Sequence, residues 1–218
     1  MFGLDESLAQ LSDGGVFGVV MVVAVLLGLR HATDPDHLAA VSALVTSDRS
    51  GSRGARRMGL TWGLGHATSL FALGVPVIVA RAYLPDAAQT AAETLVGLMI
   101  VALAVRLLVR RRRGGVPARS GLQAYGIGLV HGIGGTAGVG VLLLSGIADH
   151  AVAVVALAVF ALFTAVSMAL ASATVGFVLT RRPVLAGYGT VAPALGVLGL
   201  AFGVWYSLGA LHAVPYVF

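Results

Sequence analysis

The stretch VFGVVMVVAVLLGLRHATDPDHLAAVSALV, residues 16–45, joins a charge-free apolar run to a compact polar cluster. Residues 16–29 carry no charged side chain, and residues 38–45 are nearly as apolar. Between them, His31-Ala-Thr-Asp-Pro-Asp-His37 places two imidazoles and two carboxylates within seven residues. Ionisable groups are costly in hydrocarbon, so inside a membrane-length run they indicate a functional site. We expect this cluster to bind a cation or move a proton; the alternative is a purely structural polar kink.

The composition predicts a polytopic membrane protein. Hydrophobic residues make up 58% of the 218 residues, charged residues only 11%, and the mean hydropathy is +0.94. Because about 20 apolar residues cross a bilayer core, we expect an all-α protein in the lipid bilayer, with residues 1–218 forming a single transmembrane domain. The expected six helices span approximately residues 15–45, 58–80, 89–109, 122–146, 151–180 and 188–212.

The charges predict how the helices are oriented. All 14 basic residues are arginines, and most lie in three connections, near residues 46–57, 106–121 and 181–187. These connections fall on one side of the membrane, which the positive-inside rule makes the cytoplasmic side. We therefore expect both termini outside, a bacterial-type inner (plasma) membrane, and no nucleic-acid partner despite a pI near 10.4. Trp62, near an inner helix end, is expected in the interfacial aromatic belt.

The chemistry available to a metal is limited by the absence of cysteine. Imidazole, carboxylate, carbonyl and water remain as ligands, and imidazole with carboxylate suits first-row divalent metals. On an unbroken helix His31 and His37 lie about 120° apart, but we expect a kink at Pro35 to bring them together with Asp36. Asp34 is expected to orient the imidazole of His31 from outside the ligand set. The choice between Asp34 and Asp36 as direct ligand stays open, with Asp36 favoured modestly.

Further polar groups enter other apolar segments at a matching depth. His66 lies in the second segment and His131 in the fourth, and both are candidate ligands because their depth matches that of the cluster. Arg30 is expected to pair with Asp34 or Asp36, since an unpaired arginine there is costly. The candidate hydroxyl partners are Thr33, Thr68, Ser69 and Thr136. By contrast, His150 and His212 are expected near the outer surface.

Two of the segments are predicted to be broken helices. Pro35 disfavours helical structure at Asp34, and five glycines between residues 132 and 140 lower helix propensity in the fourth segment. Broken helices in the first and fourth of six segments suggest two inverted three-helix repeats that meet at a midplane site. Glycine pairs such as Gly59/Gly63 and Gly128/Gly132 also fit close helix packing, and the two roles are compatible.

Three motifs resemble the nickel/cobalt transporter family, NiCoT or NicO, and in particular its short bacterial members related to urease-accessory nickel permeases. The first is His31-Ala-Thr-Asp-Pro-Asp36-His37, the second is Gly65-His66-Ala67-Thr68, and the third is His131-Gly-Ile-Gly-Gly-Thr136. The resemblance implies transport of Ni²⁺ or Co²⁺, with His31, Asp36 and His37 as the core metal site and His66 and His131 as contributors. It also implies an intracellular acceptor that receives the metal.

These observations predict a permease and not an enzyme. We expect a secondary-type carrier that takes up Ni²⁺, Co²⁺ or both as cargo, with no bound cofactor. Import is favoured over export because residues 110–120 contain no histidine, whereas exporters of this family often carry a histidine-rich inner loop. One alternative is a proton-coupled carrier or channel for another solute, with the histidines as a proton relay. Another is an intramembrane metalloenzyme with Asp34 or Asp36 as general base.

Overall fold

The computed structural model describes residues 4–46, 51–80, 85–112, 120–134 and 146–215, and these residues form helices and turns without a strand. The helices are α1 (Leu4–His31), α2 (Pro35–Thr46), α3 (Gly51–Ala80), α4 (Asp86–Arg112), α5 (Gly121–His131), α7 (His150–Leu179), α8 (Arg182–Ala186) and α9 (Tyr188–Ala210). The all-α prediction is confirmed.

In the described part of the chain, four helices are each long and apolar enough to span a membrane, namely α3, α4, α7 and α9. The pair α1 and α2 passes the same test as one span bent by 48°. The protein is therefore a multi-pass membrane protein, as its composition predicts. The expected fourth segment, residues 122–146, is described only in part, over α5, the turn at residues 132–134 and residue 146. The number of six membrane-spanning helices therefore stays a prediction.

Helix α1 begins before its expected start at residue 15, and α3 before its expected start at residue 58. The reason is physical: hydropathy marks the part of a helix that suits hydrocarbon, whereas a helix continues into water until a breaker or a cap stops it. The other described span boundaries lie within about three residues of those expected, which is the usual precision of helix ends. The end of the fourth span stays a prediction, because residues 135–145 lie outside the described part of the chain.

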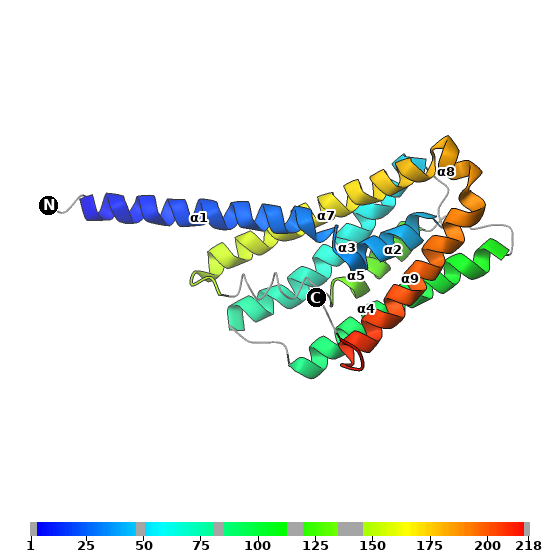
Figure 1. The fold of residues 1–218 in the computed structure, drawn as a ribbon. Coiled ribbons are helices and arrows are strands. Elements are labelled where there is room, and N and C mark those ends of the chain that lie inside the picture. The colour runs from blue at the N-terminus through cyan, green and yellow to red at the C-terminus, as the bar shows by residue number, and fades with distance from the viewer. Residues whose placement is uncertain (1–3, 47–50, 81–84, 113–119, 135–145, 216–218) are drawn as a thin grey trace.

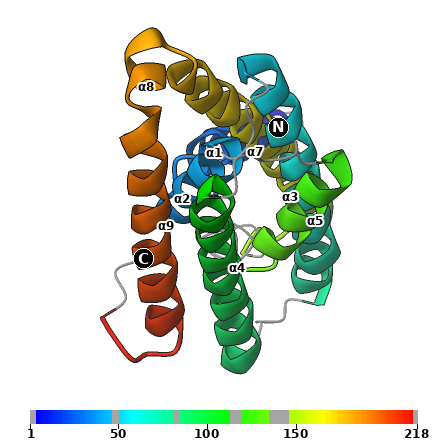
Figure 2. The same cartoon turned by 90° about the vertical axis from the view of Figure 1, so that its right-hand side faces the viewer.

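The helices form two closely packed groups joined by α2. Helix α3 packs along α7 and α5, and α1 lies along α7, whereas α4 pairs with α9 (Figures 1 and 2). The short helix α2 contacts α9, α4 and α7. The hydroxyl group of Tyr188 at the start of α9 donates to the carbonyl oxygen of Thr46, which fixes the end of α2.

Small residues allow the close approach of these pairs. A Cβ atom added at Gly63 would lie 2.7 Å from the Cα atom of Ala165 on α7, and one added at Gly203 would lie 2.9 Å from the backbone nitrogen of Val101 on α4. The close packing that the sequence predicts at Gly63 is thus present, and Gly203 has the same role between α9 and α4. Many large apolar side chains face outward, as lipid requires; Val19 is 64% exposed and Leu198 is 65% exposed.

The arginine-bearing ends of the helices lie together. Figure 1 shows the start of α3, the end of α4 and the short helix α8 at the same end of the bundle. Arg53, Arg56 and Arg57 lie in the first turns of α3, and Arg181 and Arg182 lie at the start of α8. The described arginines of the three connections therefore share one end, as predicted.

Candidate metal centre

The break between α1 and α2 creates one half of the site. Pro35 has no amide hydrogen and disfavours helical structure at the preceding residue, so α1 ends at His31 and α2 begins at Pro35. The intervening turn is held by hydrogen bonds from the amide of Thr33 to Arg30 O (2.8 Å) and from the amide of Leu38 to Asp34 O (3.0 Å). The bend brings the rings of His31 and His37 to a centroid distance of 4.4 Å.

The second half comes from the packing of α5 against α3. A Cβ atom added at Gly128 would clash with the carbonyl group of Trp62 and lie 2.8 Å from the amide nitrogen of His66. Ser69 Oγ donates to Leu129 O at 2.7 Å and ties the two helices together. Helix α5 then ends at His131, whose ring centroid lies 5.9 Å from that of His66. The absence of a side chain at Gly128 thus lets α5 bring His131 to the cluster.

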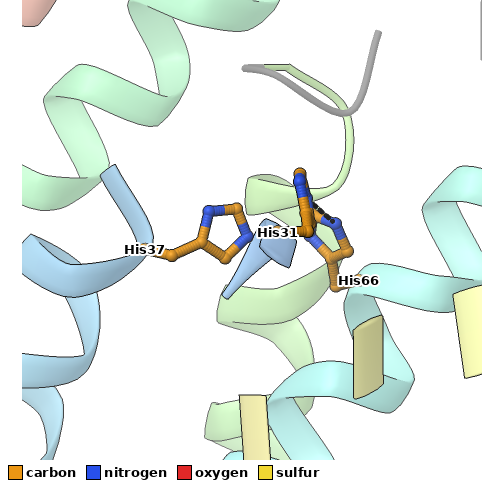
Figure 3. A group of neighbouring side chains, drawn as sticks. All are labelled: His31, His37 and His66. Atoms are coloured by element: carbon orange, nitrogen blue, oxygen red, sulfur yellow. Dashed lines mark hydrogen bonds between the residues drawn. The ribbon is translucent and has the colours of Figure 1, made fainter. Parts of the chain in front are cut away.

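Five side chains meet where these helices converge, and all of them are buried. Their exposed fractions are 4% for His31, 2% for Asp36, 1% for His37, and 0% for His66 and His131. Figure 3 shows His31, His37 and His66 reaching toward one another from separate elements, α1, α2 and α3. The metal ligands predicted from the sequence are therefore brought together by the fold.

Short contacts link the five groups in pairs. His31 Nε2 lies 3.0 Å from His66 Nε2. Asp36 bridges two imidazoles: Oδ1 accepts from His37 Nδ1 at 3.1 Å, and Oδ2 lies 3.0 Å from His131 Nε2. In a metal-free protein these contacts are hydrogen bonds, and they bring the nitrogen and oxygen atoms close enough to share an ion.

Among the described residues, two sets of three side chains have their donor atoms within 4.8 Å of one another. One set is His31, His37 and His66; the other is Asp36, His37 and His131. Both sets offer neutral nitrogen, and the second adds an anionic oxygen. Such donors suit divalent metals from the middle and end of the first transition row.

Several ring nitrogens in the cluster are buried without a hydrogen-bond partner among the described residues. They are His37 Nε2, His66 Nδ1 and His131 Nδ1. Leaving a buried polar group unpaired costs about 1–3 kcal/mol. A metal ion coordinated through His37 Nε2 would remove this penalty for that atom, so the residues present fit a cation site.

Asp34 lies beside the cluster and contacts different partners from Asp36. Its Oδ2 atom is 3.2 Å from His31 Nδ1, and its Oδ1 atom is 3.7 Å from a guanidinium nitrogen of Arg30. A carboxylate that holds Nδ1–H of an imidazole directs the lone pair of Nε2 at a metal. This is the arrangement expected from the sequence, including the pairing of Arg30. The Arg30 side chain itself is 74% exposed.

The described hydroxyl groups that were candidate partners of the cluster donate to backbone carbonyl oxygens instead. Thr33 Oγ1 donates to Arg30 O at 2.6 Å, Thr68 Oγ1 donates to Leu64 O at 2.8 Å, and Ser69 binds Leu129 as described above. Thr136 lies outside the described residues. His150 and His212 are exposed and lie apart from the cluster, as expected.

Trp62 corrects one expectation. It was expected in the interfacial belt, but it is 1% exposed, and its ring centroid lies 5.7 Å from that of His37 and 5.5 Å from that of His131. The signal was present in the sequence, because Trp62 precedes His66 by four residues and so shares its helix face. Trp62 forms an apolar wall of the site.

Comparisons with known proteins find similarity to nickel-transport proteins. The family described as NicO, high-affinity nickel-transport protein, matches residues 17–112, a range that includes His31, Asp36, His37 and His66. The chain is therefore similar to this family of membrane transporters over α1 to α4, and the resemblance predicted from its motifs is confirmed.

Two curated relatives agree with this similarity. The urease accessory protein UreH of Bacillus sp. (strain TB-90) is 24% identical over 143 residues, covering 58% of this chain and 62% of that protein. The nickel transporter NicT of Mycobacterium tuberculosis (strain ATCC 25618 / H37Rv) is 40% identical over 72 residues, covering 32% of this chain and 19% of NicT. The chain thus spans less than two thirds of either relative. No solved structure matches.

Proposed function

We propose that this protein carries Ni²⁺ across the membrane through the buried centre formed by His31, Asp36, His37, His66 and His131. The observation that carries the proposal is the convergence of four imidazoles and one carboxylate, each at most 4% exposed, at the break of a membrane helix. Such groups are costly in hydrocarbon and are retained where they bind or conduct something. The similarity to nickel transporters supports Ni²⁺ as cargo, and the same donors would accept Co²⁺.

We propose uptake as the direction of transport. An inward-negative potential favours inward movement of a cation by about 2.3 kcal/mol per charge per 100 mV, so a divalent ion gains twice this amount. The sequence contains no phosphate-binding loop, which supports a secondary carrier. We place the arginine-bearing end at the cytoplasm, both termini outside, and the protein in a bacterial-type inner membrane. An intracellular acceptor would then receive the metal.

The contacts of the two carboxylates, Asp34 and Asp36, favour transport over catalysis. Both oxygens of Asp36 contact imidazoles, and Asp34 contacts His31 and Arg30. These contacts support ligand and orienting roles over the role of a general base. A proton relay is the second candidate, because the 3.0 Å contacts of His31 with His66 and of Asp36 with His131 are also suited to proton movement.

Substitution of His37, which belongs to both ligand sets, tests the proposal. We expect His37→Ala to abolish Ni²⁺ accumulation in proteoliposomes loaded with a Ni²⁺ indicator. His150→Ala removes an exposed histidine at the start of α7 and should keep the wild-type rate. Wild-type uptake by a folded His37→Ala variant would refute the site. Proton flux without Ni²⁺ uptake by the wild type would favour the relay.

A further inference from the structure

The two ligand sets share one residue, His37. Building on the proposed function, we propose that the cargo ion occupies two adjacent positions in turn and that His37 hands it from one to the other. The first position is held by His31, His37 and His66, and the second by Asp36, His37 and His131. Each chain carries one ion at a time. His37 binds the ion through one ring nitrogen in the first position and through the other in the second, and the proton of the neutral ring moves to whichever nitrogen the ion leaves.

The spacing of donor atoms supports two positions. In an octahedral ion with bonds of about 2.1 Å, neighbouring ligand atoms lie about 3.0 Å apart. His31 Nε2 and His66 Nε2 already have this separation of 3.0 Å. Asp36 Oδ2 and His131 Nε2 have it as well, also at 3.0 Å. Each position therefore has a ready-made pair of ligands, and His37 is the third member of both.

The ring of His37 is oriented to serve both positions. Its Nδ1 atom faces Asp36 Oδ1 at 3.1 Å. Its Nε2 atom is buried without a partner among the described residues, and Figure 3 shows the ring nitrogen remote from the backbone pointing toward His31 and His66. The ring also stacks on His131 at a centroid distance of 4.1 Å. The two nitrogens of one imidazole thus face the two ligand sets.

Charge distinguishes the two positions. The set of His31, His37 and His66 offers only neutral imidazoles, whereas the other set includes the carboxylate of Asp36. In a buried site of low dielectric constant, an anionic ligand strengthens the binding of a dication. We expect the ion to rest at the Asp36 position and to visit the all-histidine position during transport.

The test compares variants that each remove one position. Purified His66→Ala and His131→Ala proteins are titrated with Ni²⁺ by calorimetry, examined by Ni K-edge X-ray absorption, and assayed for uptake in proteoliposomes. His66→Gln and His131→Gln serve as bulkier replacements, and helical content with a monodisperse elution profile shows that each protein is folded.

The proposal predicts different results for the two variants. His66→Ala should bind one Ni²⁺ per chain within about threefold of the wild-type affinity, with an unchanged absorption spectrum, because the resting position is intact. His131→Ala should bind about 10-fold to 100-fold more weakly, a loss typical of a removed metal contact, and its spectrum should change. Both variants should lose uptake.

Three results would overturn the proposed movement of the ion between two positions. The first is an equal loss of affinity in both variants with the same spectral change, which indicates a single site with all five ligands. The second is retained uptake by either variant. The third is simultaneous binding of two ions by the wild type. If the wild type neither binds nor transports Ni²⁺, the proposed function itself fails.

Discussion

Asp34 and Asp36 are separated by one residue but contact different partners. Asp36 lies between His37 and His131, whereas Asp34 lies against His31 and Arg30. The proline between them explains the difference, because it starts a new helix and turns Asp36 toward α5. The sequence predicted the polar cluster and the orienting role of Asp34. It could not separate the two carboxylates firmly, since their directions depend on the bend angle.

Asp34→Asn tests the orienting role. The amide oxygen can still accept from His31 Nδ1, but the negative charge that strengthens the imidazole as a ligand is lost. His31 belongs to the all-histidine position, so we expect Ni²⁺ uptake to fall about 10-fold to 100-fold, a typical effect of losing such a partner, while equilibrium affinity stays within about threefold of the wild type. Proteoliposome uptake and calorimetry measure the two quantities, with Asp86→Asn at the exposed start of α4 as the matched control. Wild-type uptake by Asp34→Asn would contradict the orienting role.

At the scale of elements, the contact between α3 and α5 sets the position of His131. The sequence predicted a break near Pro35 and another in the glycine-rich string, and α1 and α5 do end at His31 and His131. It also predicted close packing at Gly128 and Gly132. It did not predict that α5 packs on α3, because this contact depends on the rotation of one helix against another. The place of Trp62 beside the site was missed although its four-residue spacing from His66 indicates a shared helix face.

Gly128→Ala probes this contact. The added methyl group would clash with the carbonyl of Trp62 and push α5 away from α3. We expect the free energy of unfolding to fall by about 1–3 kcal/mol, which is typical of overpacking, and Ni²⁺ binding to become weaker because His131 is displaced. Gly126→Ala is the control, because nothing lies within 4 Å of a Cβ atom there. Thermal unfolding and calorimetry in detergent measure the two effects. Equal behaviour of the two variants would contradict the packing role.

At the scale of the whole molecule, membrane character and metal chemistry follow from different parts of the sequence. Hydropathy predicted a helical membrane protein and most helix boundaries, because the bilayer fixes the length of apolar runs. The arginines predicted a common end for three connections, and the described arginines there agree (Figure 1). The inverted repeat stays a prediction, because much of the fourth segment lies outside the described residues.

The convergence of the polar groups could be predicted only in part. Matched depth of His31, His66 and His131 indicated that they meet, and the fold brings them together. The division into two ligand sets that share His37 required the structure, because it depends on which ring nitrogen faces which neighbour. Sequence spacing carries no information of that kind.

The most direct test of the central claim is equilibrium Ni²⁺ binding by detergent-purified wild type and by the His31→Ala/His37→Ala double variant. Co²⁺, Zn²⁺ and Mn²⁺ are measured alongside at two pH values. The account predicts one saturable Ni²⁺ site per wild-type chain, weaker at the lower pH because protons compete for the imidazoles, and no such site in the double variant. A wild-type protein without a saturable Ni²⁺ or Co²⁺ site, or a double variant that keeps it, would contradict the account.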